Sequence, residues 1–302
     1  MYWLNFLHIY QPPNQKPSIL KKIVEQSYRP LFQALVSSPN AKLTLNINAV
    51  LTDLLFDNGY QDVIDLIKVL VDRGQIELTA SAKYHPFLPS LPKSEIIRQI
   101  ELNNQTNRHF FGSKYKPTGF FIPEMAYTDR IGLLVKKLGY NWTILDQSAL
   151  PGYKISSDIY RLKNKLNIII RNLETSLALI ATDNSQEIIE KYFSNSLNMP
   201  NNSYFVTAMD GEIFGHHRPN QIKIDLYEKS SFNNVTISEF IAINKNRIEI
   251  KPLESSWDIA EIKDSLPFNR LANPDNKIQI LQVKLLTLAI KYVQHDVKLH
   301  GF

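Results

Sequence analysis

The sequence predicts an α/β protein built as a closed or nearly closed (β/α) barrel, and three observations support this. Short apolar segments that read as strands alternate with amphipathic segments of helical period from the first residue onward. This order is typical of a parallel sheet with helices outside it. At least seven strand candidates occur along the chain, which favours a barrel over an open sheet. The length of 302 residues, with 44% hydrophobic and 21% charged residues, is that of a soluble globular protein.

Five strands and four helices are predicted in the first half of the chain. The segment 42–47 (KLTLNI) alternates polar and apolar residues, whereas 59–73 repeats apolar residues at helical spacing. Ser18 is placed to cap the first helix, and Gly139 ends the fourth. The predicted strands are 2–8, 42–47, 75–80, 117–121 and 140–145, and the helices are 19–36, 59–73, 94–111 and 127–138.

Four further strands and three further helices are predicted in the second half. The last helix is strongly amphipathic, with Ile278, Leu281 and Leu285 on one face. The strands are 159–162, 166–171, 203–209 and 248–251, and the helices are 185–193, 220–229 and 276–294. We therefore expect a (β/α) barrel catalytic domain at 1–262. A C-terminal helical segment at 263–302 looks like the first part of a longer helical domain.

Charge and cysteine content exclude several function classes. The 34 Lys and Arg residues against 29 Asp and Glu leave a net charge of +5, which is scattered, so no basic stripe indicates a nucleic-acid partner. The absence of cysteine excludes disulfide scaffolds, thiolate zinc sites and cysteine nucleophiles. With 10 glycines and no phosphate loop or dinucleotide fingerprint, we expect no cofactor and no metal. No leader pattern and no apolar run of ~20 residues is found, so we expect a cytoplasmic protein without a membrane partner.

Polar residues that can carry chemistry follow or interrupt four of the predicted strands, at His8, Glu77, Glu124 and Asp210. Each has a structural explanation when taken alone: a core histidine, a carboxylate that opens a helix, or half of an Asp-Gly turn. Glu77 is the hardest to explain in this way, because a carboxylate inside an apolar strand must be paired or protonated. We expect Glu77 to be buried and hydrogen-bonded on the interior face of its strand. Because active sites of (β/α) barrels lie at the carboxyl ends of the strands, the four positions together predict one site.

Two carboxylates on one rim, with histidines and aromatic residues around them, indicate sugar chemistry. Cleavage of a glycosidic bond needs one carboxyl group to protonate the leaving oxygen and a second to attack the anomeric carbon or to activate water. The 3 Trp, 14 Tyr and 15 Phe residues offer flat faces on which sugar rings can stack. We therefore expect an oligo- or polysaccharide as the substrate.

The same segments resemble glycoside hydrolase family 57, the group of α-amylases, 4-α-glucanotransferases and branching enzymes. The resemblance spans roughly residues 2–295. It covers four of the five short sequence regions by which the family is recognised, in the same order. The matching segments are His8-Ile-Tyr-Gln-Pro, Gly74-Gln-Ile-Glu with Tyr84-His-Pro after it, Ile122-Pro-Glu-Met-Ala, and Met209-Asp-Gly-Glu-Ile-Phe-Gly-His-His. Ser255-Ser-Trp also looks like a family segment near the sugar site.

This resemblance implies an incomplete (β/α)7 barrel, a retaining mechanism and α-glucan-type substrates. It implies that Glu124 is the nucleophile and Asp210 the general acid/base. The remaining implied roles are sugar binding by His8, Gln11, Glu77 and His85, shaping of the acid/base side by Glu212 and His216, and stacking or closure of the pocket by Trp257. We expect the carboxyl groups of Glu124 and Asp210 to face each other at the roughly 5–5.5 Å of retaining enzymes.

Departures from the family pattern leave other functions open. Tyr10 stands where the family has the second histidine of its first region, and we expect the family's helical C-terminal domain and fifth region to be largely missing. A catalytically weak sugar-binding homologue would fit these departures. A metal-dependent polysaccharide deacetylase would need two histidines four residues apart, and no pair here has that spacing. The sequence does not decide between hydrolysis and transfer to a sugar acceptor. It also leaves open which glucan is used and what the oligomeric state is.

Overall fold

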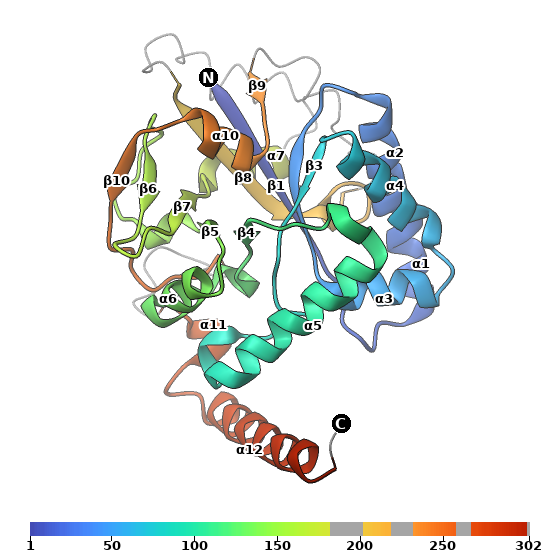
Figure 1. Cartoon of the computed structure of the whole chain (residues 1–302), viewed down its shortest axis with the longest axis vertical. Coiled ribbons are helices and arrows are strands. Elements are labelled where there is room, and N and C mark those ends of the chain that lie inside the picture. Colours follow the sequence, from blue (N-terminus) through green and yellow to red (C-terminus); the bar gives the residue numbers. More distant parts are fainter. Residues whose placement is uncertain (182–201, 219–231, 258–266, 301–302) are drawn as a thin grey trace.

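The computed structural model describes residues 1–181, 202–218, 232–257 and 267–300. Strands and helices alternate along the chain as predicted, and helices α1 to α5 cover the outside of the sheet that contains β1 (Figure 1). The helices predicted at 185–193 and 220–229 and the domain boundary predicted at 262 lie outside the described residues.

The described strands form two five-stranded sheets. The first contains β1 (Tyr2–Ile9), β2 (Leu43–Ile47), β3 (Ile76–Leu78), β8 (Tyr204–Asp210) and β9 (Asn233–Asn234). The second contains β4 (Gly119–Phe120), β5 (Trp142–Leu145), β6 (Ile159–Arg161), β7 (Asn167–Ile170) and β10 (Arg247–Glu249).

The order of the strands is β3-β2-β1-β8 in the first sheet, with β9 beside β1, and β10-β6-β7-β5-β4 in the second. All pairs are parallel except β6 with β7. A parallel bridge between Ala80 and Phe120 connects the two sheets. The α/β class is therefore confirmed, while closure into an incomplete (β/α)7 barrel stays a prediction because the strands pair as two sheets.

Four of the helices in the described ranges have no counterpart among the predicted helices: α3, α7, α10 and α11. In α3 the residues Ala49, Val50, Leu51 and Leu55 are all buried, so the segment has no clear polar face to mark it as a helix. The helices are α1 (Pro17–Ile23), α2 (Arg29–Ser37), α3 (Ala49–Asp57), α4 (Gln61–Asp72), α5 (Lys93–Phe111), α6 (Asp129–Lys137), α7 (Leu173–Ala181), α10 (Ile237–Ile243), α11 (Asn269–Ala272) and α12 (Lys277–His300).

The helix predicted at 19–36 is divided in the structure by a π-helical turn, η1 (Val24–Tyr28), between α1 and α2. The N–H of Arg29 donates to the carbonyl of Val24, five residues earlier, instead of the usual four. Pro30 explains the change, because proline has no N–H and its ring clashes with the carbonyl four residues before it. The carbonyl of Gln26 therefore has no N–H four residues later from which to accept a bond.

Strand β1 shows how the core positions the site. Trp3, Leu7 and Ile9 pack in the cluster shared with the outer helices, whereas Leu4 and Phe6 pack in a separate interior cluster. Alternate residues of a strand point to opposite faces, so His8 continues the interior row at the carboxyl end of β1. The interior cluster thus ends at a histidine, where the strand leaves the core.

The helical segment at the C-terminus contains α11 and α12, and α12 extends away from the sheets (Figure 1). Its apolar residues Ile278, Leu281, Leu285, Leu288 and Tyr292, which the sequence placed at helical spacing, are exposed. No helix in the described part of the chain is both long and apolar enough to span a bilayer.

Candidate active site

His8 and Asp210 stand side by side at the carboxyl ends of neighbouring strands. β1 and β8 pair in parallel with His8 opposite Asp210, and His8 is buried whereas Asp210 is exposed. Nδ1 of His8 lies 2.7 Å from Oδ1 of Asn46 on β2. Burial lowers the pKa of His8, against the charge of Asp210 and the bond to Asn46. The imidazole is therefore neutral near pH 7.

Glu124 occupies a strained turn after β4. Within the turn η4 (Pro123–Met125), Glu124 and Met125 have φ angles of 60° and 48°, a region that residues other than glycine rarely adopt. The hydroxyl of Ser256 donates to the Glu124 carbonyl at 2.9 Å, and the backbone N–H of Trp257 donates to it at 3.1 Å. The indole N–H of Trp257 donates to Oε2 of Glu124 at 2.9 Å. Both the backbone and the carboxylate of Glu124 are therefore fixed.

His85 connects Glu124 to His8. Its Nδ1 lies 3.6 Å from Oε1 of Glu124, and its ring stacks on those of Tyr10 and His8 with centroids 4.6 and 4.7 Å away. Burial, together with the neighbouring His8, holds the pKa of His85 well below its usual value, so the ring is neutral. Its Nε2 is buried and has no hydrogen-bond partner among the described residues.

Trp257 and Arg171 complete the wall on the Glu124 side. The Arg171 guanidinium lies 5.5 Å from the centre of the Trp257 ring and 3.2 Å from Oδ2 of Asp146, and it is buried. Sequence analysis missed both Arg171 and Asp146. Asp146 directly follows the predicted strand 140–145 and Arg171 ends the predicted strand 166–171, so both stand at strand ends like His8 and Asp210 and could have been found.

Glu212 lies two residues after Asp210 and is buried. Its Oε1 accepts hydrogen bonds from the Tyr28 hydroxyl, from Nε2 of Gln11 at 3.1 Å and from the backbone N–H of Tyr10 at 3.3 Å. Burial and the charge of Asp210 raise the pKa of Glu212 to about 7, against these donors. Gln11 therefore contacts Glu212, and its expected role in sugar binding stays a prediction.

Glu77 and His216 lie apart from this cluster. Glu77 is half-buried, and its carboxylate accepts bonds from the N–H and hydroxyl of Ser238 at the start of α10 and from Thr44. Burial raises its pKa against these donors. The predicted hydrogen bonding of Glu77 is confirmed, whereas its side chain is half-buried rather than buried, since it lies at the start of α10. His216 is half-buried, with Nδ1 2.7 Å from Oε1 of Gln26.

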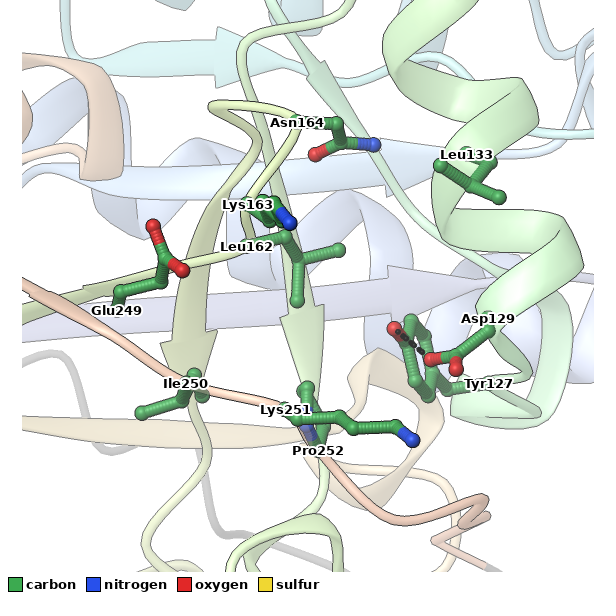
Figure 2. Close-up of a pocket in the computed structure, with 10 residues that line it drawn as sticks. All are labelled: Tyr127, Asp129, Leu133, Leu162, Lys163, Asn164, Glu249, Ile250, Lys251 and Pro252. Carbon is green, nitrogen blue, oxygen red and sulfur yellow. Dashed lines mark hydrogen bonds between the residues drawn. The ribbon is translucent and has the colours of Figure 1, made fainter.

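A separate pocket of about 490 Å³ lies between α6 and the β6–β7 hairpin (Figure 2). In it the Tyr127 hydroxyl donates to Asp129 at 3.0 Å. The pocket contains none of the predicted site residues; its lining is Tyr127, Asp129, Leu133, Leu162, Lys163, Asn164, Glu249, Ile250, Lys251 and Pro252.

Several known proteins are similar to this chain. An α-amylase of Pyrococcus horikoshii is 30% identical over 146 residues, which is 47% of this chain and 22% of the amylase. The structure of the 4-α-glucanotransferase of Thermococcus litoralis matches with a TM-score of 0.72 at 20% identity, over 85% of this chain and 41% of that one. A branching enzyme of Pyrococcus horikoshii matches with a TM-score of 0.71 at 19% identity, over 85% and 73%. At these identities the two structures show a shared fold.

The chain covers less than a quarter of the length of that amylase. The family model of glycosyl hydrolase family 57 matches residues 4–252, which contain every predicted site residue except Trp257. On this match, the chain belongs to glycosyl hydrolase family 57.

Proposed function

We propose that the chain is a retaining glycoside hydrolase or transglycosylase acting on α-glucans, with Glu124 as the nucleophile and Asp210 as the general acid/base. One observation carries the proposal: His8 pairs in register with Asp210 and stacks on His85, and His85 lies 3.6 Å from the Glu124 carboxylate. The two acids therefore flank one pair of neutral imidazoles, on different strand ends.

In this reaction, the Glu124 carboxylate attacks the anomeric carbon while Asp210 gives its proton to the departing glycosidic oxygen. The bond from the Trp257 indole to Oε2 holds the carboxylate in place, so less orientation is left to be gained at the moment of attack. Asp210 then takes a proton from water or from a sugar hydroxyl while the oxygen of that acceptor attacks the anomeric carbon, and the Glu124 carboxylate leaves. Water gives hydrolysis, and a sugar acceptor gives transfer.

The neutral state of His8 and His85 suits an uncharged sugar. A neutral imidazole can donate from one nitrogen and accept at the other, as the hydroxyl groups of a glucose unit require. The neutral ring of His85 is such a group, and its Nδ1 lies 3.6 Å from Oε1 of Glu124. The stacked rings of Tyr10 and His85 add a flat face for the ring of the sugar.

The test is to incubate the protein with maltoheptaose, to size the products, and to record the anomer formed first by proton NMR. Retention predicts that the new reducing ends appear as the α-anomer before mutarotation. First formation of the β-anomer would overturn the retaining mechanism. Binding of maltoheptaose without any product, in several preparations, would favour the sugar-binding homologue instead.

A further inference from the structure

A buried ion pair stands at the carboxyl ends of β5 and β7. Asp146 and Arg171 directly follow these paired strands, and Nη1 of Arg171 lies 3.2 Å from Oδ2 of Asp146. Oδ1 of Asp146 accepts a bond from the backbone N–H of Ser148 at 2.9 Å, so both carboxylate oxygens are engaged. The backbone of Arg171 is fixed as well, because its N–H donates to the Leu145 carbonyl at 2.8 Å. The guanidinium therefore has little freedom to move.

Stability alone is a poor explanation for this ion pair. Both side chains are buried, and the transfer of two charges from water costs free energy that their mutual attraction often fails to recover. Burial lowers the pKa of Arg171, against the charges of Asp146 and Asp210. The side chain keeps its proton nonetheless, since a guanidinium is not deprotonated in proteins. Arg171 is thus a permanent buried cation, and the groups around it indicate its use.

The Arg171 guanidinium lies over the indole ring of Trp257, with its central carbon 5.5 Å from the ring centre. A cation in this position is attracted by the electron-rich face of the indole. The rings of Phe121 and His8 also pack against the indole, each tilted by 59°, with centroids 5.5 and 6.0 Å away. The Trp257 ring is therefore held by neighbours from several strand ends, and Arg171 supplies a charged contact.

The backbone bonds of this segment do not by themselves orient the indole. The N–H of Trp257 and the hydroxyl of Ser256 both donate to the Glu124 carbonyl, which fixes the main chain. The ring can still turn about the two torsions of its side chain. Its N–H donates to Oε2 of Glu124 at 2.9 Å, and this bond requires one particular setting of those torsions. A contact on the face of the ring favours that setting.

We propose that Arg171 is a positioning residue for the nucleophile: held by Asp146, its guanidinium fixes the Trp257 ring in the orientation from which the indole N–H donates to the Glu124 carboxylate. The inference rests on the proposed function, in which Glu124 attacks the anomeric carbon. Three direct contacts carry it, from Asp146 to Arg171, from Arg171 to Trp257 and from Trp257 to Glu124. Because Arg171 acts through Trp257, its loss should lower kcat and leave KM nearly unchanged.

The kinetic test compares kcat and KM on maltoheptaose for the unmodified chain, a neutral-pair variant, Trp257→Phe and their combination. The neutral-pair variant carries Arg171→Gln together with Asp146→Asn, because either change alone leaves a buried charge without its partner. We expect it to lower kcat by about fivefold. KM should change by less than about twofold. In the Trp257→Phe background the neutral pair should cause no further loss, because the donor through which Arg171 acts is already gone.

Arg247→Gln is the matched control for the loss of a fixed guanidinium. Nε of Arg247 donates to Oδ1 of Asn167 at 3.0 Å, at the start of β7, whereas Arg171 lies at the end of the same strand. The control should cost stability and leave kcat near normal. An equal fall of kcat in the control, or an equal loss from the neutral pair with and without Trp257→Phe, would overturn the proposal.

A spectroscopic signal that needs no turnover separates this proposal from the proposed function. The chain has three tryptophans, and the indoles of Trp3 and Trp142 donate to hydroxyl groups instead of a carboxylate. In NMR spectra of the nitrogen-labelled indoles, Glu124→Ala should move the Trp257 signal in the unmodified chain and move it much less in the neutral-pair background. The signals of Trp3 and Trp142 should stay in place. Equal movement of the Trp257 signal in both backgrounds would show that its bond to Glu124 does not depend on Arg171, and would overturn the proposal.

The two measurements fail in different ways. If the unmodified protein turns over no α-glucan but the Trp257 signal behaves as expected, the proposed function fails while the link from Arg171 to Glu124 holds. If the neutral-pair variant does not fold, Arg171→Met together with Asp146→Leu replaces the ion pair by apolar side chains, a change that buried pairs often tolerate. The same kinetic and NMR outcomes then support or overturn the proposal.

Discussion

The two candidate catalytic carboxylates are held in opposite ways, although both follow parallel strands. Glu124 lies in a left-handed turn whose carbonyl and carboxylate both accept bonds from Trp257, and its histidine neighbour is neutral. Asp210 is exposed at the end of β8, and the buried carboxylate of Glu212 lies two residues further on. Glu124 is thus held by its backbone conformation and by hydrogen bonds, whereas Asp210 is exposed and has a second, buried carboxylate close to it in the sequence.

This difference matches what each group has to do in a retaining reaction. A nucleophile gains from being held in one position, since orientation lowers the barrier. A general acid/base has to change its protonation state in every cycle, so the charge of its neighbours matters more than a rigid position. Variants on the Glu124 side should therefore change rates at all pH values, and variants on the Asp210 side should change the response to pH or to the leaving group.

The largest effect is expected from Glu124→Gln. An amide of the same size cannot form the glycosyl ester, so activity on maltooligosaccharides should fall by roughly 10⁴-fold or more at every pH. Initial rates measured by product chromatography test this. Glu249→Gln, which changes an exposed carboxylate on β10, is the control and should keep the full rate. A Glu124→Gln rate within about tenfold of the control would remove Glu124 from the reaction.

Asp210→Asn should lower activity by an amount that depends on the leaving group of the substrate. With maltooligosaccharides, whose leaving oxygen needs a proton, we expect a loss of roughly 10²–10⁴-fold. With a nitrophenyl α-glucoside, whose leaving group needs none, formation of the glycosyl ester should be far less affected. Equal losses on both substrates would show that Asp210 is not the general acid, and Glu212 would be the next candidate.

Glu212 should make stability depend on pH. Its pKa is raised from 4.5 to about 7 in the folded chain, so between these values the folded chain binds a proton that the unfolded chain has released. The free energy of unfolding should therefore fall as pH rises through this window, by about 3 kcal/mol in total. Urea unfolding at steps across the window should show a flatter curve for Glu212→Gln. Identical slopes for both proteins would contradict the raised pKa.

The smallest effect is expected from Trp257→Phe, which keeps an aromatic ring but removes the donor to Glu124. Loss of a bond to a charged group should lower kcat by about tenfold at all pH values and change KM little. Trp142→Phe is the matched control, because the Trp142 indole donates to Ser238 at 2.9 Å in the core. It should cost stability and leave kcat near normal. Equal kcat in both variants would show that the Trp257 bond does not position the nucleophile.

The sequence allowed the strand ends to be predicted, and with them most of the candidate site. Short apolar segments marked the strands β1 and β8, so His8 and Asp210 were expected at strand ends, and the structure places them opposite each other there. Contacts between distant parts of the chain could not be predicted this way. Tyr28 reaches Glu212 across 184 residues of sequence, through a π-helical turn that has no periodic pattern.

Two structural features that were not predicted, helix α10 and the π-helical turn η1, do have a recognisable pattern in the sequence. The Thr236–Glu239 capping box announces α10, the helix whose start binds Glu77. Pro30, inside a predicted helix, marks the place where η1 departs from regular geometry. The left-handed backbone of Glu124 had no such signal, because neither Glu124 nor Met125 is a residue that favours it. Strain of this kind becomes visible only in the fold.

The central claim, that Glu124 forms a covalent bond to the sugar, is tested most directly by trapping the intermediate. The protein is incubated with 5-fluoro-α-glucosyl fluoride, whose ester breaks down slowly, then digested, and the labelled peptide is identified by mass spectrometry. The account predicts one fluoroglucosyl group on Glu124 and none on the Glu124→Gln variant. A label on Asp210 or on another carboxylate, or turnover of maltoheptaose with inversion and without any label, would contradict it.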